Sequence, residues 1–241
     1  MTDTCSREPI LTPWPSLNEA LGGGLYPGFY ALVGKTGAGR TQFAMQAALA
    51  AAKAGTPVWF VSWQSGPFEL GSRLLGLTTD IRWPDLVQGR VSMDDLRQIG
   101  EVSVPLSGIP LLCDLVPRQD PITADDIIGG IRHVRVTEGT PDDRNVLVVL
   151  DSPTLRDSAA LKQMALDALV AAGAANAAVL LIPETDSIDA VADPARYVLS
   201  LVNEHRTSHE VHLDVLVSPD DRPHRIDLLF DGTTFREKTP A

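Results

Sequence analysis

The chain has 241 residues, of which 44% are hydrophobic and 21% are charged, and its formal net charge is −11. This composition is typical of a soluble globular protein with one large domain or two small ones. The acidic balance argues against a general nucleic-acid binder, because such binding depends on Lys and Arg. Two cysteines are too few for a disulfide framework, and the N-terminus lacks a signal pattern. We therefore expect a cytoplasmic protein that does not span a membrane.

Strands and helices alternate from residue 29 to residue 182. Strands are expected at Phe29–Val33, Val58–Ser62, Leu111–Leu115, Val146–Leu150 and Ala178–Ile182. Helices are expected at Thr41–Ala54, at Pro67–Leu77, after Ser92, from Thr123 to about Thr137, and at Ser158–Ala172. The five consecutive aliphatic residues of Val146–Leu150 favour a central parallel strand that is buried on both faces.

The last 45 residues follow a different pattern, in which strands are separated by turn residues. These strands are expected at Tyr197–Val202, Val211–Val217, Arg225–Phe230 and Thr233–Arg236. The dipeptide Asp231-Gly232 is a hairpin signal. The fold class is therefore α/β: a mostly parallel twisted sheet flanked by helices and completed by antiparallel C-terminal strands. We expect residues 1–15 to form an N-terminal extension and residues 16–241 to form one domain.

A glycine-rich loop follows the first strand and reads Gly-Lys-Thr-Gly-Ala-Gly-Arg-Thr. The P-loop pattern is Gly, four residues, Gly, Lys, then Ser or Thr. In such loops glycines let backbone N–H groups surround a phosphate, and the helix N-terminus adds positive charge. The flanking strand and helix favour this interpretation over a chance glycine-rich turn. The expected residues for ATP or another nucleoside triphosphate are Gly34, Lys35, Thr36, Gly37, Ala38, Gly39, Arg40 and Thr41.

One side chain of this loop departs from the pattern, because Arg40 occupies the lysine position. Arginine can bind two phosphate oxygens at once, but it is bulkier than lysine, which places a point charge at the end of a slim stem. Lys35 is an alternative cation, although a solvated loop lysine is the simpler interpretation.

Two residues are candidates for holding Mg²⁺. Thr41 would place its hydroxyl on the metal, as the last residue of a P-loop does. Asp151 ends the apolar run Val-Leu-Val-Val-Leu-Asp, which has the form of the Walker B strand whose aspartate holds the metal or its water shell. The alternative role of Asp151 is to cap the turn at Ser152-Pro153.

These residues together resemble the RecA-like ATPase core. The run Leu17-Asn-Glu-Ala-Leu-Gly-Gly-Gly-Leu-Tyr-Pro-Gly28, followed by a strand and a P-loop, is most similar to the C-terminal domain of the DnaB replicative helicase. The RadA and KaiC groups are neighbours of that family. The resemblance covers nearly the whole chain and includes Val58–Leu75, Val146–Asp151 and the closing run Ile226–Phe235. It implies ATP as ligand, with Mg²⁺.

The departures from the family pattern concern its chemistry. The family places a glutamate after the second strand to activate the attacking water, and Gln64 stands there in this chain. An amide can orient water but cannot take its proton. Glu184 stands where the family carries a glutamine that senses the γ-phosphate. The family's Lys-x-Arg pair, which reaches the neighbouring subunit's nucleotide, has no counterpart in Asp214–Pro219, and Arg222 lies further on.

The loops that line the DNA channel in RecA-like motors are also altered. The second loop would hold Glu184, Asp186, Asp189 and Asp193 against Arg196, and such a loop would repel a phosphate backbone. The first loop offers Arg156 and Lys162 together with Asp157. Direct DNA binding is therefore doubtful, and we expect a protein partner or a homo-oligomer instead.

Several other side chains have structural interpretations. Trp14 is expected in the core, and Trp59 and Trp63 on one packed face of the second strand. Arg132 and Arg135 are expected on a solvated helix face. His205, His209 and His212 lack the Cys or carboxylate partners that a metal site would need.

The leading hypothesis is a DnaB-like ATP-binding protein with weak or absent hydrolysis, a pseudo-ATPase that acts as an assembly or regulatory subunit in DNA replication, recombination or another complex. One alternative is an active DNA-dependent ATPase completed by partner subunits, with Glu69 as the nearest other base. A second alternative is a structural domain with an empty pocket. A third is a ParA/MinD-type loop in which Lys35 reaches across a dimer; the DnaB-like flanks and the antiparallel ending argue against it.

Overall fold

A single twisted sheet organises the chain. The computed structural model describes residues 8–116, 122–153, 155, 157–203, 209–220 and 222–238. Within these residues, nine strands form one sheet in the order β3-β2-β4-β5-β1-β6-β7-β8-β9. The strands are β1 (Gly28–Val33), β2 (Val58–Ser62), β3 (Leu111–Leu115), β4 (Val146–Asp151), β5 (Ala177–Ile182), β6 (Tyr197–Val202), β7 (Glu210–Val217), β8 (His224–Phe230) and β9 (Phe235–Glu237).

The sheet has a parallel half and an antiparallel half that meet at β6. Strands β3, β2, β4, β5, β1 and β6 are parallel, whereas β7, β8 and β9 continue the sheet as antiparallel strands. The Asp231-Gly232 turn joins β8 to β9, and Gly232 has a φ of 94°, as hairpin turns require. The predicted fold class is confirmed.

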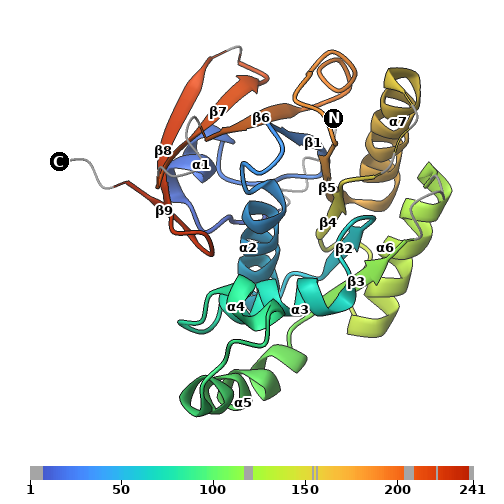
Figure 1. Cartoon of the computed structure of the whole chain (residues 1–241). Helices are drawn as coiled ribbons and strands as arrows, with labels where there is room; N and C mark the ends of the chain where they lie inside the picture. The colour runs from blue at the N-terminus through green and yellow to red at the C-terminus, as the bar shows by residue number, and fades with distance from the viewer. Residues whose placement is uncertain are drawn as a thin grey trace.

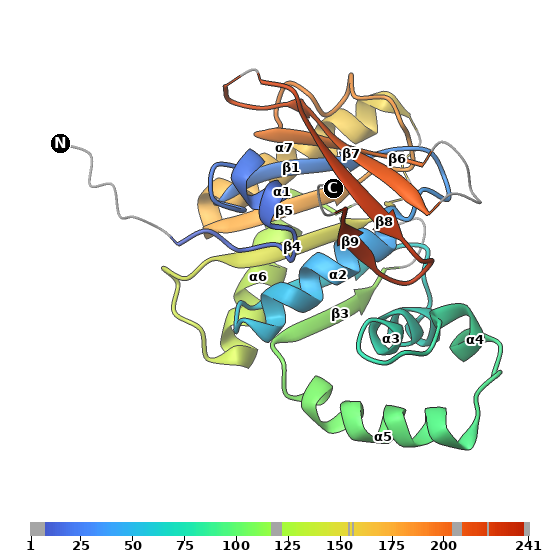
Figure 2. The same cartoon turned by 90° about the vertical axis from the view of Figure 1, so that its left-hand side faces the viewer.

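Helices cover both faces of the sheet, as Figure 1 shows, with α2 on one face and α6 and α7 on the other. The helices are α1 (Pro15–Ala20), α2 (Arg40–Lys53), α3 (Pro67–Gly76), α4 (Trp83–Val87), α5 (Met93–Ser107), α6 (Ala124–Glu138) and α7 (Ser158–Ala175). Helix α5 has no buried residue and lies away from the sheet in Figure 2. Ser92 and Thr123 precede α5 and α6 at the predicted helix starts, and both form capping boxes.

The core consists of two apolar layers because neighbouring residues of a strand face opposite sides of the sheet. In β4, Leu147 and Val149 pack in the α2 layer, whereas Val146, Val148 and Leu150 pack in the α6–α7 layer. All of them are buried. The prediction of a central strand buried on both faces is confirmed, and this strand carries Asp151 to its carboxyl end.

The tryptophan predictions are confirmed. Trp14 is 1% exposed and stacks on Phe43 at 3.9 Å between ring centroids. Trp59 and Trp63 are both buried in the α6–α7 layer. Gly130 allows α6 to approach Trp59, because a Cβ at that glycine would lie 2.2 Å from the indole ring.

The prediction for Arg135 is wrong, although Arg132 is exposed as expected. Arg135 is 5% exposed, and its Nη2 donates to the carbonyl oxygens of Arg144 at 2.8 Å and Asn176 at 3.4 Å. The guanidinium thereby satisfies backbone carbonyls of the loop before β4 and of the α7 C-terminus. Helix periodicity alone could not reveal these distant acceptors.

The short helices α1 and α4 were not predicted. Both begin with Pro in the first turn, at Pro15 and Pro84. They span six and five residues, too few for an apolar period to appear.

Candidate functional site

The loop between β1 and α2 requires glycine at two positions. Gly34 has a φ of 147°, and a Cβ there would lie 2.4 Å from the carbonyl oxygen of Leu201 in β6. Gly39 has a φ of 96°, and a Cβ there would lie 2.8 Å from the Phe235 ring. Both the backbone conformation and the close approach of neighbouring elements therefore exclude side chains.

The N-terminus of α2 opens into a cavity of about 280 Å³, which we call the loop cavity. Gly39 is the N-cap of α2 and provides no side-chain cap, so the first N–H groups of the helix are available to an anion. The residues that line the loop cavity are Thr36, Gly37, Gly39, Arg40, Thr41, Gln42, Gln64, Arg73, Trp83, Ser152, Phe230 and Gly232.

Thr41, which lines this cavity, is hydrogen-bonded to the buried Asp151 behind it. The Thr41 hydroxyl donates to Asp151 Oδ1 at 2.9 Å, and the Ser62 hydroxyl donates to Oδ2 at 3.1 Å. Burial raises the pKa of Asp151 above its ordinary value. The hydrogen bonds from Thr41 and Ser62 and the positive charge of Arg73 oppose this rise. A hydroxyl and a buried carboxylate side by side are oxygen donors that fit Mg²⁺, whose charge would also stabilise the ionised Asp151.

The Arg40 side chain passes beside Gly34, and its guanidinium reaches the segment after β5. Its Nη1 donates to the carbonyl oxygen of Pro183, with a longer contact of 3.4 Å to that of Thr185. Burial lowers the pKa of the Arg40 guanidinium. The negative charges of Asp151, Asp186 and Glu184 oppose this fall in the pKa of Arg40. The guanidinium therefore connects the first turn of α2 to the segment that follows β5.

Some of the other predicted site residues line the cavity and some do not. Gln64, which follows β2, is exposed and lines the cavity. Lys35 and Thr36 are exposed in the glycine loop, and Ala38 is buried beneath it. Glu184 is exposed beyond the end of β5 and does not line the loop cavity.

Arg73 on α3 is a cavity residue that the sequence did not suggest. It makes two hydrogen bonds to Glu69 Oε1, at 2.7 and 3.1 Å, and one to Gln42 Oε1 at 3.1 Å. Its guanidinium lies 3.9 Å from the centroid of the Trp83 ring. No motif surrounds Arg73, and an arginine on an amphipathic helix is ordinarily a surface residue. Its ion pair engages Glu69, the alternative base.

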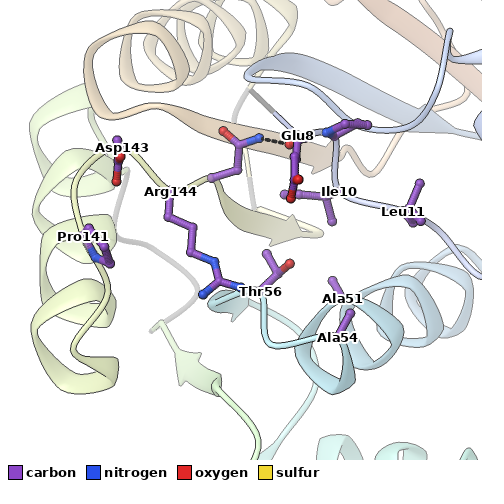
Figure 3. A pocket seen from close by; sticks show the side chains of 11 residues that line it. Glu8, Ile10, Leu11, Ala51, Ala54, Thr56, Pro141, Asp143 and Arg144 are labelled. Atoms are coloured by element: carbon purple, nitrogen blue, oxygen red, sulfur yellow. Dashed lines mark hydrogen bonds between the residues drawn. The ribbon is translucent and has the colours of Figure 1, made fainter. Parts of the chain in front are cut away.

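The largest of the cavities described here, about 500 Å³, lies at the other end of α2 (Figure 3). Ala51 and Ala54 at the helix C-terminus form one side, and Pro141 and Arg144 the other. It contains no glycine loop and no helix N-terminus, so its geometry is not that of a phosphate site.

The acidic side chains of the loop after β5 are exposed. They belong to Glu184, Asp186, Asp189 and Asp193. Arg222 is 79% exposed in its side chain and lies 3.8 Å from Asp220. Arg156 of the other predicted loop lies outside the described residues.

Among the residues that the structure describes, no group of three or more His, Cys, Asp or Glu is arranged for a metal ion. His205 lies outside those residues. Nowhere in the described part of the chain is a helix both long enough and apolar enough to cross a membrane.

The sheet order, the glycine loop before α2 and the antiparallel ending define the class as a RecA-like P-loop domain. The family model for the DnaB-like helicase C-terminal domain matches residues 10–150. Because this match covers more than half of the chain, the protein belongs to the family of DnaB-like helicase C-terminal domains. No curated protein matches the chain in sequence.

Many solved structures share the fold, and two of them are described next. The first, whose title describes it as an ATPase domain, is 14% identical, with a TM-score of 0.80, and the match covers 98% of this chain and 94% of that one. The structure titled "The Structure Of A DnaB-Like Replicative Helicase And Its Interactions With Primase" is also 14% identical, with a TM-score of 0.74. That match covers 92% of this chain and 59% of the helicase chain. The predicted resemblance to the DnaB and RecA-like fold is confirmed.

Proposed function

We propose that this protein binds ATP or another nucleoside triphosphate with Mg²⁺, hydrolyses it slowly or not at all, and serves as an assembly or regulatory subunit in DNA replication or a related process. Domains of this family generally bind nucleotide with Mg²⁺. The observation that carries the proposal is the composition of the loop cavity. The groups that would hold nucleotide are present, and none of the described residues that line the cavity is Asp or Glu.

The binding groups are the glycine loop, the N–H groups at the start of α2, and the pair Thr41 and Asp151. The glycine loop and the helix start would surround the phosphates, since both present backbone donors. Thr41 and Asp151 would hold Mg²⁺, which would neutralise phosphate charge when bound. The 2.9 Å hydrogen bond between them keeps both oxygens in one place.

The missing group is a base for the attacking water. Gln64 lines the cavity at the position expected for it, and an amide has no proton-accepting role at neutral pH. Glu69 is held by Arg73 through two hydrogen bonds and does not line the cavity. A general base ordinarily contributes roughly 10²- to 10⁴-fold in rate, so its loss supports slow turnover.

The chain also has fewer positively charged side chains that could stabilise the transition state of hydrolysis. Arg40 bonds to the Pro183 and Thr185 carbonyls. The run Asp214–Pro219 contains no Lys or Arg to reach a neighbouring subunit. An arginine supplied in trans is worth about 10³- to 10⁵-fold in related enzymes. Arg73 could contact a phosphate bound in its own chain, but it does not replace the rate contribution of an arginine from a neighbouring subunit.

The partners are proposed to be protein chains, either other copies or members of a replication complex. The exposed carboxylates after β5 would repel a DNA backbone in a channel. One structural relative is a DnaB-like replicative helicase described with its primase interactions. That description motivates a search for partners among replication proteins.

Two assays on the purified protein test the proposal. Titration of a fluorescent ATP analogue with Mg²⁺ is expected to show saturable binding below millimolar concentration. Phosphate release is expected to stay far below the ordinary enzyme range of about 1 s⁻¹ or more, with and without single-stranded DNA. Absence of binding would favour the structural domain with an empty pocket. DNA-stimulated turnover in the ordinary range would favour the active motor.

A further inference from the structure

Arg40 stands between two cavities. Its side chain lines the loop cavity, and its acceptor residues, Pro183 and Thr185, line a second cavity of about 320 Å³. This second cavity also includes Glu184 and lies beside the start of α7. The Arg40 guanidinium is thus a direct contact between the phosphate loop and the segment 183–190.

The segment 183–190 is held internally by short-range hydrogen bonds. The Ser187 N–H donates to Thr185 Oγ1 at 3.0 Å, and the Asp189 N–H donates to Ser187 Oγ at 3.4 Å. Thr185, whose carbonyl meets Arg40, is therefore also the residue that orders the next turn. Loss of the Arg40 contact would loosen the first part of the segment, which is held by local contacts, whereas Ile188 and Ala190 pack against the α6–α7 layer and hold its end.

We propose that Arg40 is a latch that the terminal phosphate of a bound nucleoside triphosphate opens. In the closed state the guanidinium binds the carbonyls of Pro183 and Thr185. In the open state it binds the phosphate, and the segment 183–190 loses its anchor on the phosphate loop. This inference rests on the proposed nucleotide binding and adds its regulation.

The competition between the two states follows from the chemistry of the acceptors. The guanidinium makes charge-assisted hydrogen bonds to both kinds of acceptor, but a phosphate also carries negative charge and offers two oxygens that a guanidinium can bind at once. Asp151, Asp186 and Glu184 all attract the guanidinium, and the last two lie on the anchored segment and favour the closed state. A diphosphate lacks the terminal phosphate and is expected to open the latch much less.

The latch would couple the nucleotide to a protein surface. Glu184, Asp186 and Asp189 are exposed on the segment that it anchors. Coupling between two binding sites is reciprocal. If triphosphate lowers the affinity of the anchored segment for a partner, the bound partner therefore lowers the affinity for triphosphate by the same factor.

Hydrogen–deuterium exchange of the purified full chain tests the latch. Peptides that cover residues 183–190 are followed without nucleotide, with ADP and Mg²⁺, and with a non-hydrolysable ATP analogue and Mg²⁺. Because a hydrogen bond to a charged group can shift an equilibrium roughly tenfold, the analogue is expected to speed exchange there by up to about that factor, and ADP much less. In Arg40→Gln, exchange is expected to be fast without nucleotide and insensitive to the analogue.

Arg97→Gln is the matched control, because Arg97 lies on α5 with 71% of its side chain exposed. It should behave as the unaltered protein.

Two results would overturn the latch. The first is unchanged exchange in Arg40→Gln without nucleotide. The second is unchanged or slower exchange in the unaltered protein when the analogue is shown to be bound. If Arg40→Gln does not fold, Arg40→Lys replaces it, and its segment 183–190 must exchange faster than that of the unaltered protein. Absence of nucleotide binding would defeat the proposed function, whereas the nucleotide-free comparison would still decide whether Arg40 anchors the segment.

Discussion

The two walls of the loop cavity differ in what they retain. The loop wall, made of Gly37, Gly39 and Thr41, with the buried Asp151 hydrogen-bonded to Thr41, carries the groups that we propose to hold phosphate and Mg²⁺. The facing side carries Gln64, and Arg40 leaves the glycine loop for the carbonyls after β5. The contrast shows that binding and turnover depend on separate groups, so that one can persist while the other weakens.

The largest expected effect concerns the loop wall. Asp151→Asn is expected to weaken Mg²⁺-dependent binding of the fluorescent ATP analogue by about 100-fold, the upper end for residues that hold or orient metal ligands. Without Mg²⁺, the variant and the unaltered protein should bind alike. If Mg²⁺ strengthens binding equally in both proteins, Asp151 does not support the metal, and the two walls do not differ as we describe.

The second largest expected effect is on the rate of phosphate release and concerns the side of the loop cavity that carries Gln64. Gln64→Glu combined with Arg40→Lys is expected to raise phosphate release at least about tenfold, because a carboxylate can accept the proton of the attacking water. Gln98→Glu on α5 makes the same chemical change outside the loop cavity and should leave the rate as it is. A double variant as slow as the unaltered protein would mean that these two positions do not limit turnover.

The smallest expected effect is on the free energy of unfolding, and it results from the burial of the Asp151 carboxyl group. Because its pKa is raised in the folded protein, the protonated form is favoured, and ionisation costs stability above the ordinary aspartate pKa of 3.8. Without Mg²⁺ at pH 7, Asp151→Asn is therefore expected to be more stable than the unaltered protein. The difference should vanish below about pH 4, in urea unfolding followed across pH. A difference that persists in acid would contradict the assignment to ionisation.

Sequence patterns predicted the local features well because their causes are local. The five aliphatics before Asp151 could only be buried on both faces, and the capping boxes at Ser92 and Thr123 bind residues three positions away. The glycine loop was predicted because its spacing reflects backbone requirements.

Features that depend on distant partners were not predicted. The direction of Arg40 depends on Pro183, 143 residues away in sequence. Arg73 enters the cavity because α3 places it beside Gln42, and Arg135 is buried because carbonyls from the loop before β4 and from the end of α7 meet it. Each outcome was decided by the assembly of the sheet and its helices.

The most direct test of the difference between the two walls is to measure binding and phosphate release on the same preparation. With Mg²⁺ and saturating ATP, with and without single-stranded DNA, the protein is expected to bind nucleotide and to release phosphate far more slowly than about 1 s⁻¹. Saturable binding with turnover at or above that rate would contradict the conclusion that the site holds nucleotide without rapidly cleaving it.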